Sequence, residues 1–492
     1  MKRIVIIGAG FGGLASAALL AKDGFDVTVL EKNDQPGGRG MLFQERGFSF
    51  DMGPSWYLMP DVFERFFARF GSLPTDHYGL TRLDPAYRVY FDDGDPTDIS
   101  ADIGRNFDLF ERIEPGGADA LRSYLARAAY QYRFSMDRFI YRDYRSLLDF
   151  LDGELIIQAT RLRLLGRIDR LVARFFRDDR LRKLLTYNLV FLGCSPSRAP
   201  ALYALMAHTD FNLGVWYPEG GMNGVARSLH QLAVDQGANF VFNSPATQIQ
   251  VDGIRATAVE SATGRYPADI VLANADYHHV EQVLLPFEAR SYSQRYWDRR
   301  AVAPSASVVF LGLDRRVPHL AHHNLLLQHG WEEHFQNIFD IPAWPRRPAL
   351  YVCCPSKSDP AVAPPGGENL FLMMPVAAGL SDSDSAREKC FEIMLHALEK
   401  TIGEGISSSI RVQRVFTQRD FSSTFNAFRG TGLGLSHTLR QTAIFRPSVQ
   451  SRRVNNLFFA GQYTPPGIGV PMTLIAATIA RNRIVADTGM FS

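Results

Sequence analysis

The first 31 residues alternate between two hydrophobic patterns that are typical of a strand–helix–strand unit. Short, mostly apolar runs, each bounded by polar or glycine residues, occupy residues 3–8 ("RIVIIG") and 26–31 ("DVTVLE"), and residues 14–23 between them are rich in Ala and Leu, with Gly24 directly after. Short continuous apolar runs are typical of strands in a parallel sheet that is covered on both faces. Ala and Leu are strong helix formers, and glycine ends helices well. The pattern therefore predicts a parallel βαβ unit.

Two further segments carry patterns that fit the same sheet. Residues 237–276 read as a β-meander with turns at Asp252-Gly253 and Thr263-Gly264, and their last apolar run, "ADIVLANAD", is predicted to return to the sheet. Residues 456–484 repeat the order of apolar strand, Gly/Pro-rich loop and small-residue helix. We therefore expect an α/β fold whose parallel sheet is assembled from three separated segments.

Length and composition limit the possible classes of protein. The 492 residues exceed what one compact core usually spans, so we expect two or three domains. The 46% hydrophobic and 21% charged residues fit a globular protein, and the net charge of +2 gives no overall field that favours nucleic acid.

The cysteines and the longest apolar runs bear on the cellular compartment. The four cysteines are scattered except for one adjacent pair, Cys353 and Cys354, and we interpret all four as reduced thiols of a cytosolic protein, without metal-ligand spacing. The first apolar run breaks at Gly8, too early for a signal peptide, and no run of 18 apolar residues occurs. If this protein meets a membrane, we expect it to lie on the surface.

The loop after the first strand matches the dinucleotide fingerprint G-x-G-x-x-G. Gly8 permits the tight turn, Gly10 lets the backbone approach a pyrophosphate, and Gly13 lets the helix pack close to the strand. Glu31 ends the second strand 18 residues after Gly13, where a carboxylate can accept hydrogen bonds from both ribose hydroxyls of an adenosine. The alternative, a glycine turn without a ligand, is disfavoured because strand, helix, strand and carboxylate are all in register.

The residues that follow favour FAD over NAD. "PGGRG" at 36–40 and "FDMGPSWY" at 50–57 come where an NAD domain usually leads into another helix. Glycines allow close backbone approach, and Arg39 can neutralise phosphate charge, although an exposed loop cation is the alternative. The helix predicted after Gly469 and Pro471 would point its free N–H groups at an electron-rich group, such as the pyrimidine edge of a flavin.

We expect the following FAD contacts and domain organisation. The contacts are Gly8, Gly10, Gly13, Glu31, Lys32, Gly38, Arg39, Gly53, Pro54, Ala246, Gly461, Gly469, Val470, Pro471 and Met472. We expect a Rossmann-like FAD-binding domain from residues 1–85, 222–285 and 440–492. A mixed-sheet substrate domain is expected from 86–140 and 286–439, and a helical, membrane-associating region from 141–221.

Motifs from both ends and the middle of the chain resemble bacterial and archaeal phytoene desaturases of the carotenoid pathway, within the flavin amine oxidase superfamily. They are "GAGFGGL…LEKNDQPGGRG…FDMGPSWY", "GVWYPEGGMNGVARSL" at 214–229, "ANAD" at 273–276 and "NLFFAGQYTPPGIGVPM" at 456–472. The resemblance runs end to end. The first motif is shared across the superfamily, whereas the central and C-terminal motifs are more specific to carotenoid desaturases.

The resemblance implies an oxidoreductase that acts on a polyene hydrocarbon. FAD would take a hydride at N5 while the neighbouring carbon loses a proton, and repetition would convert phytoene toward neurosporene or lycopene. Reduced FAD would be reoxidised by quinone or oxygen. By the family's S-x-x-D-x-L pattern, Asp149 matches the proposed acid or base, but Leu148 stands where the family often has arginine. A solvated or capping aspartate is the alternative.

A basic segment in the middle of the chain suggests how a bilayer substrate is reached. On a helix over 161–183, five arginines from Arg163 to Arg177 fall within about 80° of arc, opposite Leu, Ile, Val and Phe. Such a helix can lie on an anionic membrane. The alternative, equally weighted, is a surface helix that packs its apolar face on the protein core.

His437, the only ionisable group besides the arginines in 425–447, is a weaker candidate for a role in the chemistry.

Three rival functions remain open from the sequence. Another polyene could be the substrate: a C30 dehydrosqualene, a hydroxycarotenoid, or the substrate of a carotenoid oxidase. An amine oxidase would need a polar site with an aromatic cage. A carrier of prenyl groups on the same fold, as in GDP-dissociation inhibitors, would need no working flavin site, and the complete loop with Gly8, Gly10, Gly13 and Glu31 argues against it.

Overall fold

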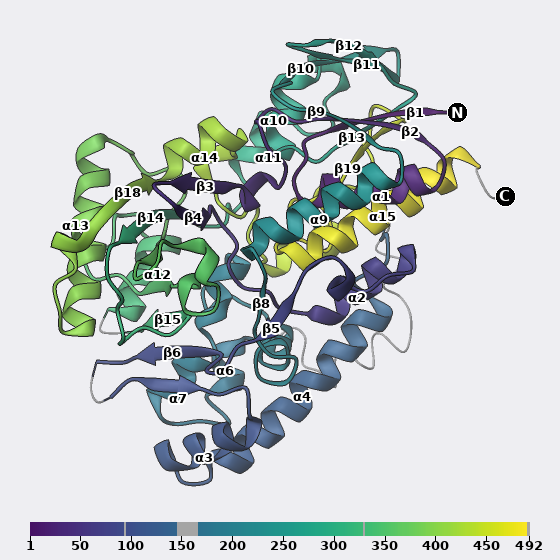
Figure 1. The fold of residues 1–492 in the computed structure, drawn as a ribbon. Coiled ribbons are helices and arrows are strands. Elements are labelled where there is room, and N and C mark those ends of the chain that lie inside the picture. The colour runs from purple at the N-terminus through teal and green to yellow at the C-terminus, as the bar shows by residue number, and fades with distance from the viewer. Residues whose placement is uncertain (93–94, 145–165, 328–329, 490–492) are drawn as a thin grey trace.

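A five-stranded parallel sheet draws its strands from three separated parts of the chain (Figure 1). The computed structural model describes residues 1–92, 95–144, 166–327 and 330–489. The sheet order is β19 (Leu457–Phe459), β13 (Ile270–Ala273), β1 (Arg3–Ile7), β2 (Asp26–Leu30) and β9 (Asn239–Val241), and all neighbours run parallel. Ile7 stands opposite both Leu30 and Ala273. The α/β class and the assembly of this sheet from distant segments are confirmed.

The two faces of this sheet are covered differently, which explains why its strands are apolar throughout. Ile4 and Ile6 pack with α1 (Phe11–Lys22), α9 (Gly221–Asp235) and α15 (Val470–Thr488). Val5 and Ile7 pack on the opposite side with the predicted meander. The meander is confirmed as β10 (Ala246–Asp252), β11 (Arg255–Ser261) and β12 (Gly264–Pro267), paired antiparallel. Successive strand residues point to opposite faces, so burial on both sides needs a continuous apolar run.

A second, seven-stranded mixed sheet forms the other half of the molecule (Figure 1). Its order is β18 (Ile410–Phe416), β14 (Ser305–Leu313), β17 (Glu368–Val376), β16 (Leu350–Cys353), β15 (His323–Leu326), β6 (Tyr87–Tyr90) and β7 (Thr97–Ile99). Val309 and Leu311 pack toward α13 (Asp384–Ile402), whereas Val308 and Phe310 face a larger core shared with the central helices. β14 is buried along its whole length.

The remaining elements connect the two sheets. Two short antiparallel pairs are β3 (Leu42–Glu45) with β4 (Phe48–Asp51), and β5 (Leu80–Arg82) with β8 (Trp216–Pro218). The other helices are α2 (Pro60–Phe67), α3 (Ile103–Ile113), α4 (Gly117–Arg138), α6 (Ile168–Val172), α7 (Asp179–Leu184), α8 (Leu205–Ala207), α10 (Tyr277–His279), α11 (Gln294–Asp298), α12 (Trp331–Phe339) and α14 (Gln418–Phe425). A π-helical turn, His208–Asn212, continues α8.

The prediction of one amphipathic helix over 161–183 is wrong for the described part, residues 166–183. The chain forms α6, leaves the helix, and starts α7 after Asp178, whose side chain accepts a hydrogen bond from the N–H of Arg180. Glu114 also accepts the N–H groups of Arg177 and Asp178 and so fixes the break. Residues 161–165 lie outside the described residues.

The apolar side of this segment packs inside the protein. Ile168, Leu171 and Phe176 are buried in the large core. Arg170, Arg174 and Arg177 are exposed, as the arginine spacing predicts. The alternative in which the apolar face packs on the protein core is therefore the one that the structure shows. Among the helices of the described residues, none is both long and apolar enough to cross a bilayer.

Candidate functional site

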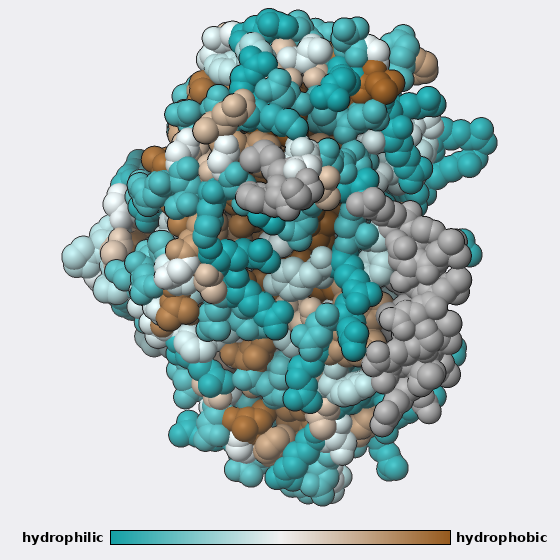
Figure 2. Space-filling model, turned by 90° about the vertical axis from the view of Figure 1, so that its right-hand side faces the viewer, coloured by the Kyte–Doolittle hydropathy of each residue, from teal (hydrophilic) through white to brown (hydrophobic). Residues whose placement is uncertain are grey.

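A cavity of about 880 Å³ lies between the two sheets and the central helices. Its size is near the upper end of small-molecule sites, which span roughly 300–1,000 Å³. Figure 2 shows a mostly hydrophilic face with hydrophobic residues visible in a hollow near its middle. Every expected FAD contact except Gly13 lines this cavity. The structure thus brings together residues from both ends of the chain and the meander.

The first glycine loop has the geometry that the fingerprint requires. Gly8 has φ +98° and donates its N–H to the carbonyl of Leu30 at 2.8 Å. A Cβ added at Gly13 would lie 2.0 Å from the carbonyl oxygen of Gly8. Gly13 therefore acts in helix–strand packing, which explains why it does not line the cavity. A Cβ at Gly10 would lie 2.9 Å from Oδ1 of Asn274 and would narrow the space above the loop.

The second glycine pair packs directly on the first loop. Gly37 donates its N–H to the carbonyl of Ala9 at 2.8 Å, and a Cβ at Gly38 would lie 3.0 Å from Cα of Gly10. A Cβ at Gly53 would lie 2.4 Å from the carbonyl oxygen of Arg39. Only glycine fits these approaches, so the loops form one cradle around the cavity wall.

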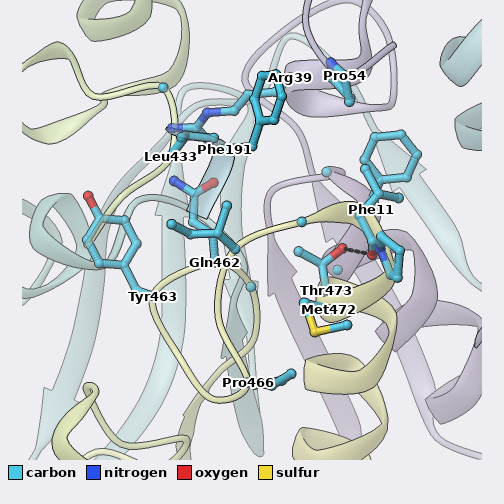
Figure 3. Close-up of a pocket in the computed structure, with 18 of the residues that line it drawn as sticks. Phe11, Arg39, Pro54, Phe191, Leu433, Gln462, Tyr463, Pro466, Met472 and Thr473 are labelled. Carbon is cyan, nitrogen blue, oxygen red and sulfur yellow. Dashed lines mark hydrogen bonds between the residues drawn. The ribbon is translucent and has the colours of Figure 1, made fainter. Parts of the chain in front are cut away.

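Arg39 and Gln462 present donors without partners in this cradle. The Nε and Nη2 atoms of Arg39 and the Nε2 atom of Gln462 are buried, and no described residue hydrogen-bonds to them. The Arg39 guanidinium lies 5.3 Å from the Phe425 ring centroid, and burial lowers its pKa. Figure 3 shows Arg39, Gln462, Tyr463 and Met472 among the residues that line the cavity. A desolvated cation and amide in a glycine cradle fit the phosphates of a dinucleotide such as FAD.

Glu31 is held at the end of β2 by three hydrogen bonds. Its carboxylate accepts the N–H of Ala9 at 2.6 Å, and the N–H and side-chain amide of Asn33 at 2.9 and 2.8 Å. Desolvation raises the pKa of Glu31, and these bonds oppose the shift. A carboxylate has further lone pairs that can accept hydrogen bonds from the ribose hydroxyls of an adenosine. This contact stays a prediction. Lys32 donates to Asn426 Oδ1 at 3.1 Å.

The loop before α15 is shaped by two buried basic residues. His437 Nε2 accepts the N–H of Ile468 at 3.1 Å, and its Nδ1 lies 2.7 Å from the hydroxyl of Tyr203. Burial lowers the pKa of His437 well below its ordinary value, so the imidazole is neutral. Arg446 donates to the carbonyls of Gln462 and Tyr463. The structure therefore gives His437 a positioning role, and its weaker candidacy for a role in the chemistry stays a prediction.

Two cavity residues after β13 were not among the predicted contacts. Asn274 donates from Nδ2 to the carbonyl of Ala460 at 2.8 Å and lies against Gly10 and Gly461. Asp276 accepts the hydroxyl of Tyr463 at 2.7 Å and the N–H of Phe428 at 3.2 Å. Their position at the carboxyl end of a parallel strand is the signal that could have identified them, because ligands bind at that edge.

The rest of the lining is largely apolar, which suits a hydrocarbon. It includes Trp56, Val190, Phe191, Leu192, Val308, Phe371, Met373 and Leu433. The candidate catalytic residue Asp149 lies outside the described residues. No described residue of the cavity replaces it as an identified base.

The thiols and one His/Cys group lie apart from the cavity lining. All four cysteines are free and buried. His322, His323 and Cys353 bring possible ligand atoms within 4.8 Å of one another, a grouping that sequence spacing did not indicate. His322 Nδ1 and His323 Nδ1 are hydrogen-bonded to the hydroxyls of Ser358 and Tyr351.

Comparison with known proteins agrees with this geometry. The family described as flavin containing amine oxidoreductase matches residues 11–485. A carotenoid 3,4-desaturase of Haloarcula japonica is 43% identical over 98% of both chains, and a zeta-carotene-forming phytoene desaturase of Myxococcus xanthus is 37% identical over 98% of this chain and 94% of that one. The crystal structure of an oxidoreductase from Methanosarcina mazei has a TM-score of 0.62 at 18% identity, covering 96% of this chain and 98% of that chain.

Proposed function

Because this chain belongs to the flavin containing amine oxidoreductase family, and within it to the phytoene desaturase family, we propose that it is an FAD-dependent carotenoid desaturase. Its reaction removes two hydrogens from a saturated C–C bond beside the conjugated part of a linear polyene. Phytoene, converted toward neurosporene or lycopene, is the first substrate to test. The observation that carries the proposal is one continuous cavity that joins the dinucleotide cradle to an apolar wall.

The residues of the cradle suit the cofactor's charge and shape. Arg39 and Gln462 offer unpartnered donors to the diphosphate, and Gly10, Gly38 and Gly53 leave room for the backbone to approach it. The N-terminus of α15 presents backbone N–H groups and the positive end of the helix dipole at the same cavity. When bound, a flavin supplies the acceptor for a hydride from a C–H bond.

The protein's own part in the reaction is mainly to position the polyene and exclude water. Phe191, Met373 and Leu433 belong to an apolar wall that binds a hydrocarbon without competing polar contacts. One C–H bond breaks and its hydrogen leaves with the electron pair, as hydride. The neighbouring C–H bond then loses its hydrogen as a proton, and the electron pair left behind forms the new double bond. The developing positive charge is allylic and spreads over the polyene, so alignment is the principal demand on the protein.

The proposal also covers the electron acceptor and the place in the cell where the protein acts. Quinone or oxygen reoxidises the cofactor, and the protein works at the surface of the membrane that holds its substrate. The exposed Arg170, Arg174 and Arg177 support this location, since basic side chains are attracted to anionic lipid.

The test supplies purified, flavin-loaded protein with candidate substrates in liposomes and follows the visible absorption spectrum. The substrates are phytoene, a C30 dehydrosqualene, a hydroxylated linear carotenoid and a primary diamine. Longer-wavelength absorption with any polyene supports the proposal. Peroxide release with the diamine and no change with the polyenes indicates an amine oxidase, and a protein that never binds flavin favours a prenyl carrier.

A further inference from the structure

A buried carboxylate interrupts the apolar lining of the cavity. Asp210 lies in the π-helical turn His208–Asn212 and is 5% exposed. Its Oδ2 atom accepts the hydroxyl of Tyr87 at 2.8 Å and that of Tyr187 at 3.3 Å. Its Oδ1 atom is buried and has no hydrogen-bond partner in the ranges that the structure covers. Single π-helical turns of this kind occur frequently at functional sites.

Two neighbouring cavity residues carry unpartnered polar atoms as well. The indole Nε1 of Trp56 and the amide Oδ1 of Asn188 are buried without a described partner. The Trp56 ring packs 5.5 Å from the ring of Tyr87 and 6.3 Å from that of Tyr187, centroid to centroid. Asn188 follows Tyr187 in the chain. The three residues that carry these atoms therefore adjoin the same two tyrosines. We call the group the Asp210 cluster: Trp56, Tyr87, Tyr187, Asn188 and Asp210.

The composition of the Asp210 cluster selects among ligand chemistries. It offers one donor, the indole N–H, and two acceptors, the oxygens of Asp210 and Asn188. A hydrocarbon would leave all three unpaired, and a carbonyl could satisfy only the donor. An ammonium group could satisfy only the acceptors. A hydroxyl both donates and accepts, so it is the small neutral substituent of a polyene that can pair with both kinds of atom.

We propose that the Asp210 cluster is a subsite for a hydroxyl group of the polyene, so that the enzyme prefers a hydroxylated linear carotenoid to the parent hydrocarbon. This inference rests on the proposed carotenoid desaturase function and specifies its substrate class. Asp210 Oδ1 accepts the single hydroxyl hydrogen, Trp56 donates to the hydroxyl oxygen, and Tyr87 and Tyr187 hold the carboxylate in place.

The protonation of Asp210 does not restrict this pairing. Desolvation raises the pKa of Asp210 to about 7, and the two tyrosine hydroxyls oppose the shift. The carboxylate form accepts a hydrogen bond from a hydroxyl, and the protonated form can donate one to it. A hydroxyl therefore pairs with Asp210 in either protonation state.

The experiment compares two carotenoids of equal length that differ only in one hydroxyl, each in liposomes with the flavin-loaded protein. Dissociation constants come from quenching of tryptophan fluorescence, and kcat/KM from product formation. The unsubstituted protein should favour the hydroxylated compound at least tenfold in both quantities, because a site built to bind a hydroxyl rejects the analogue that lacks it. Asp210→Leu should remove the preference, because it weakens binding and turnover of the hydroxylated compound. Asp210→Asn should retain part of the preference.

The matched control is Thr209→Val, a neighbour in the same turn that also lines the cavity. Its hydroxyl is already bonded to the carbonyl of Met206 at 2.8 Å, so the preference should stay unchanged. If Asp210→Leu fails to retain flavin, Trp56→Phe removes only the donor and should lower the preference several-fold.

The outcomes separate this inference from the proposed function. Equal binding and turnover of the two carotenoids by the unsubstituted protein overturns the subsite while the desaturase function stands. A preference that survives both Asp210→Leu and Trp56→Phe also overturns it. Failure to desaturate either carotenoid, together with oxidation of an amine, rejects the proposed function itself.

Discussion

The imidazole of His437 accepts a 3.1 Å hydrogen bond from the backbone N–H of Ile468. This bond connects His437 to the loop that leads into α15. A Cβ on Gly467 would lie 2.3 Å from the same ring, so the loop can approach His437 only because glycine stands there. The position of the α15 N-terminus therefore depends on a residue that lies 31 positions before Ile468 in the sequence.

Replacing His437 by Gln should lower stability in a pH-dependent way. Burial holds the pKa of His437 well below its ordinary value, whereas in the unfolded chain it titrates near about 6.5. Below that pH the unfolded chain binds a proton that the folded protein does not, so the residue's contribution to stability falls by about 1.4 kcal/mol per pH unit. The gap in unfolding temperature between the parent protein and His437→Gln should be largest above pH 6.5 and narrow in acid.

The control for this prediction is His319→Gln, because His319 is exposed. The unfolding temperature of this variant should equal that of the parent protein at every pH. A gap for His437→Gln that stays constant from pH 7.5 to 5 would show that the buried imidazole is not the titrating group.

Replacing Arg39 by Met should weaken FAD binding with little loss of fold. The guanidinium has two buried nitrogens that lack a described partner, so the substitution removes contacts to a ligand rather than to the protein. Hydrogen bonds to charged groups contribute about 1.5–3 kcal/mol, which corresponds to roughly 10–100-fold weaker binding. Equilibrium dialysis against FAD measures the change. Arg453→Met, at an exposed position, should bind FAD like the parent, and equal affinity in both variants would remove Arg39 from the cofactor site.

Two alanine substitutions in the first glycine loop should have different effects. Gly13→Ala places a Cβ 2.0 Å from the Gly8 carbonyl, a backbone atom that cannot move without separating α1 from β1, so the protein should fail to fold or lose many degrees of thermal stability. Gly10→Ala meets a side-chain atom, Asn274 Oδ1, at 2.9 Å, and this side chain can shift. It should fold and lose flavin affinity. Thermal melting and flavin content after gel filtration check both, and the reverse order of severity would contradict the assigned roles.

Membrane attachment should depend on the exposed arginines of residues 170–177. The triple variant Arg170→Gln, Arg174→Gln, Arg177→Gln should bind anionic vesicles more weakly by about 1 kcal/mol for each arginine near the surface. The difference should shrink as salt rises, because screening weakens exposed charges. Co-sedimentation with vesicles measures it. A second triple variant at the exposed Arg295, Arg299 and Arg453 serves as the control, and equal losses in both would indicate a non-specific charge effect.

The features of the structure that the sequence predicted depend on local constraints. Gly8 has a positive φ and Gly13 packs on the Gly8 carbonyl, so the spacing of these glycines predicts the geometry of the turn. The meander and the α15 loop were predicted for the same reason, since turn glycines and apolar runs act over a few residues.

The parts that were missed depend on contacts between distant residues. The break between α6 and α7 follows from Glu114, which accepts the N–H of Arg177 63 positions later, and helical periodicity does not register such a contact. The surroundings of Asp210 likewise depend on Tyr87, 123 positions earlier, whose hydroxyl donates to its carboxylate. A single aspartate between Thr209 and Phe211 has no sequence signal until the tyrosines and Trp56 are placed around it.

The most direct test of the central claim mixes the flavin-loaded protein with carotenoid-bearing liposomes in the absence of oxygen and other acceptors. If one cavity holds both flavin and polyene, the absorption of oxidised flavin should disappear at the rate at which a longer-wavelength polyene band appears, with one new double bond for each flavin reduced. A flavin that stays oxidised in the presence of linear carotenoids but is reduced by an amine would contradict the account.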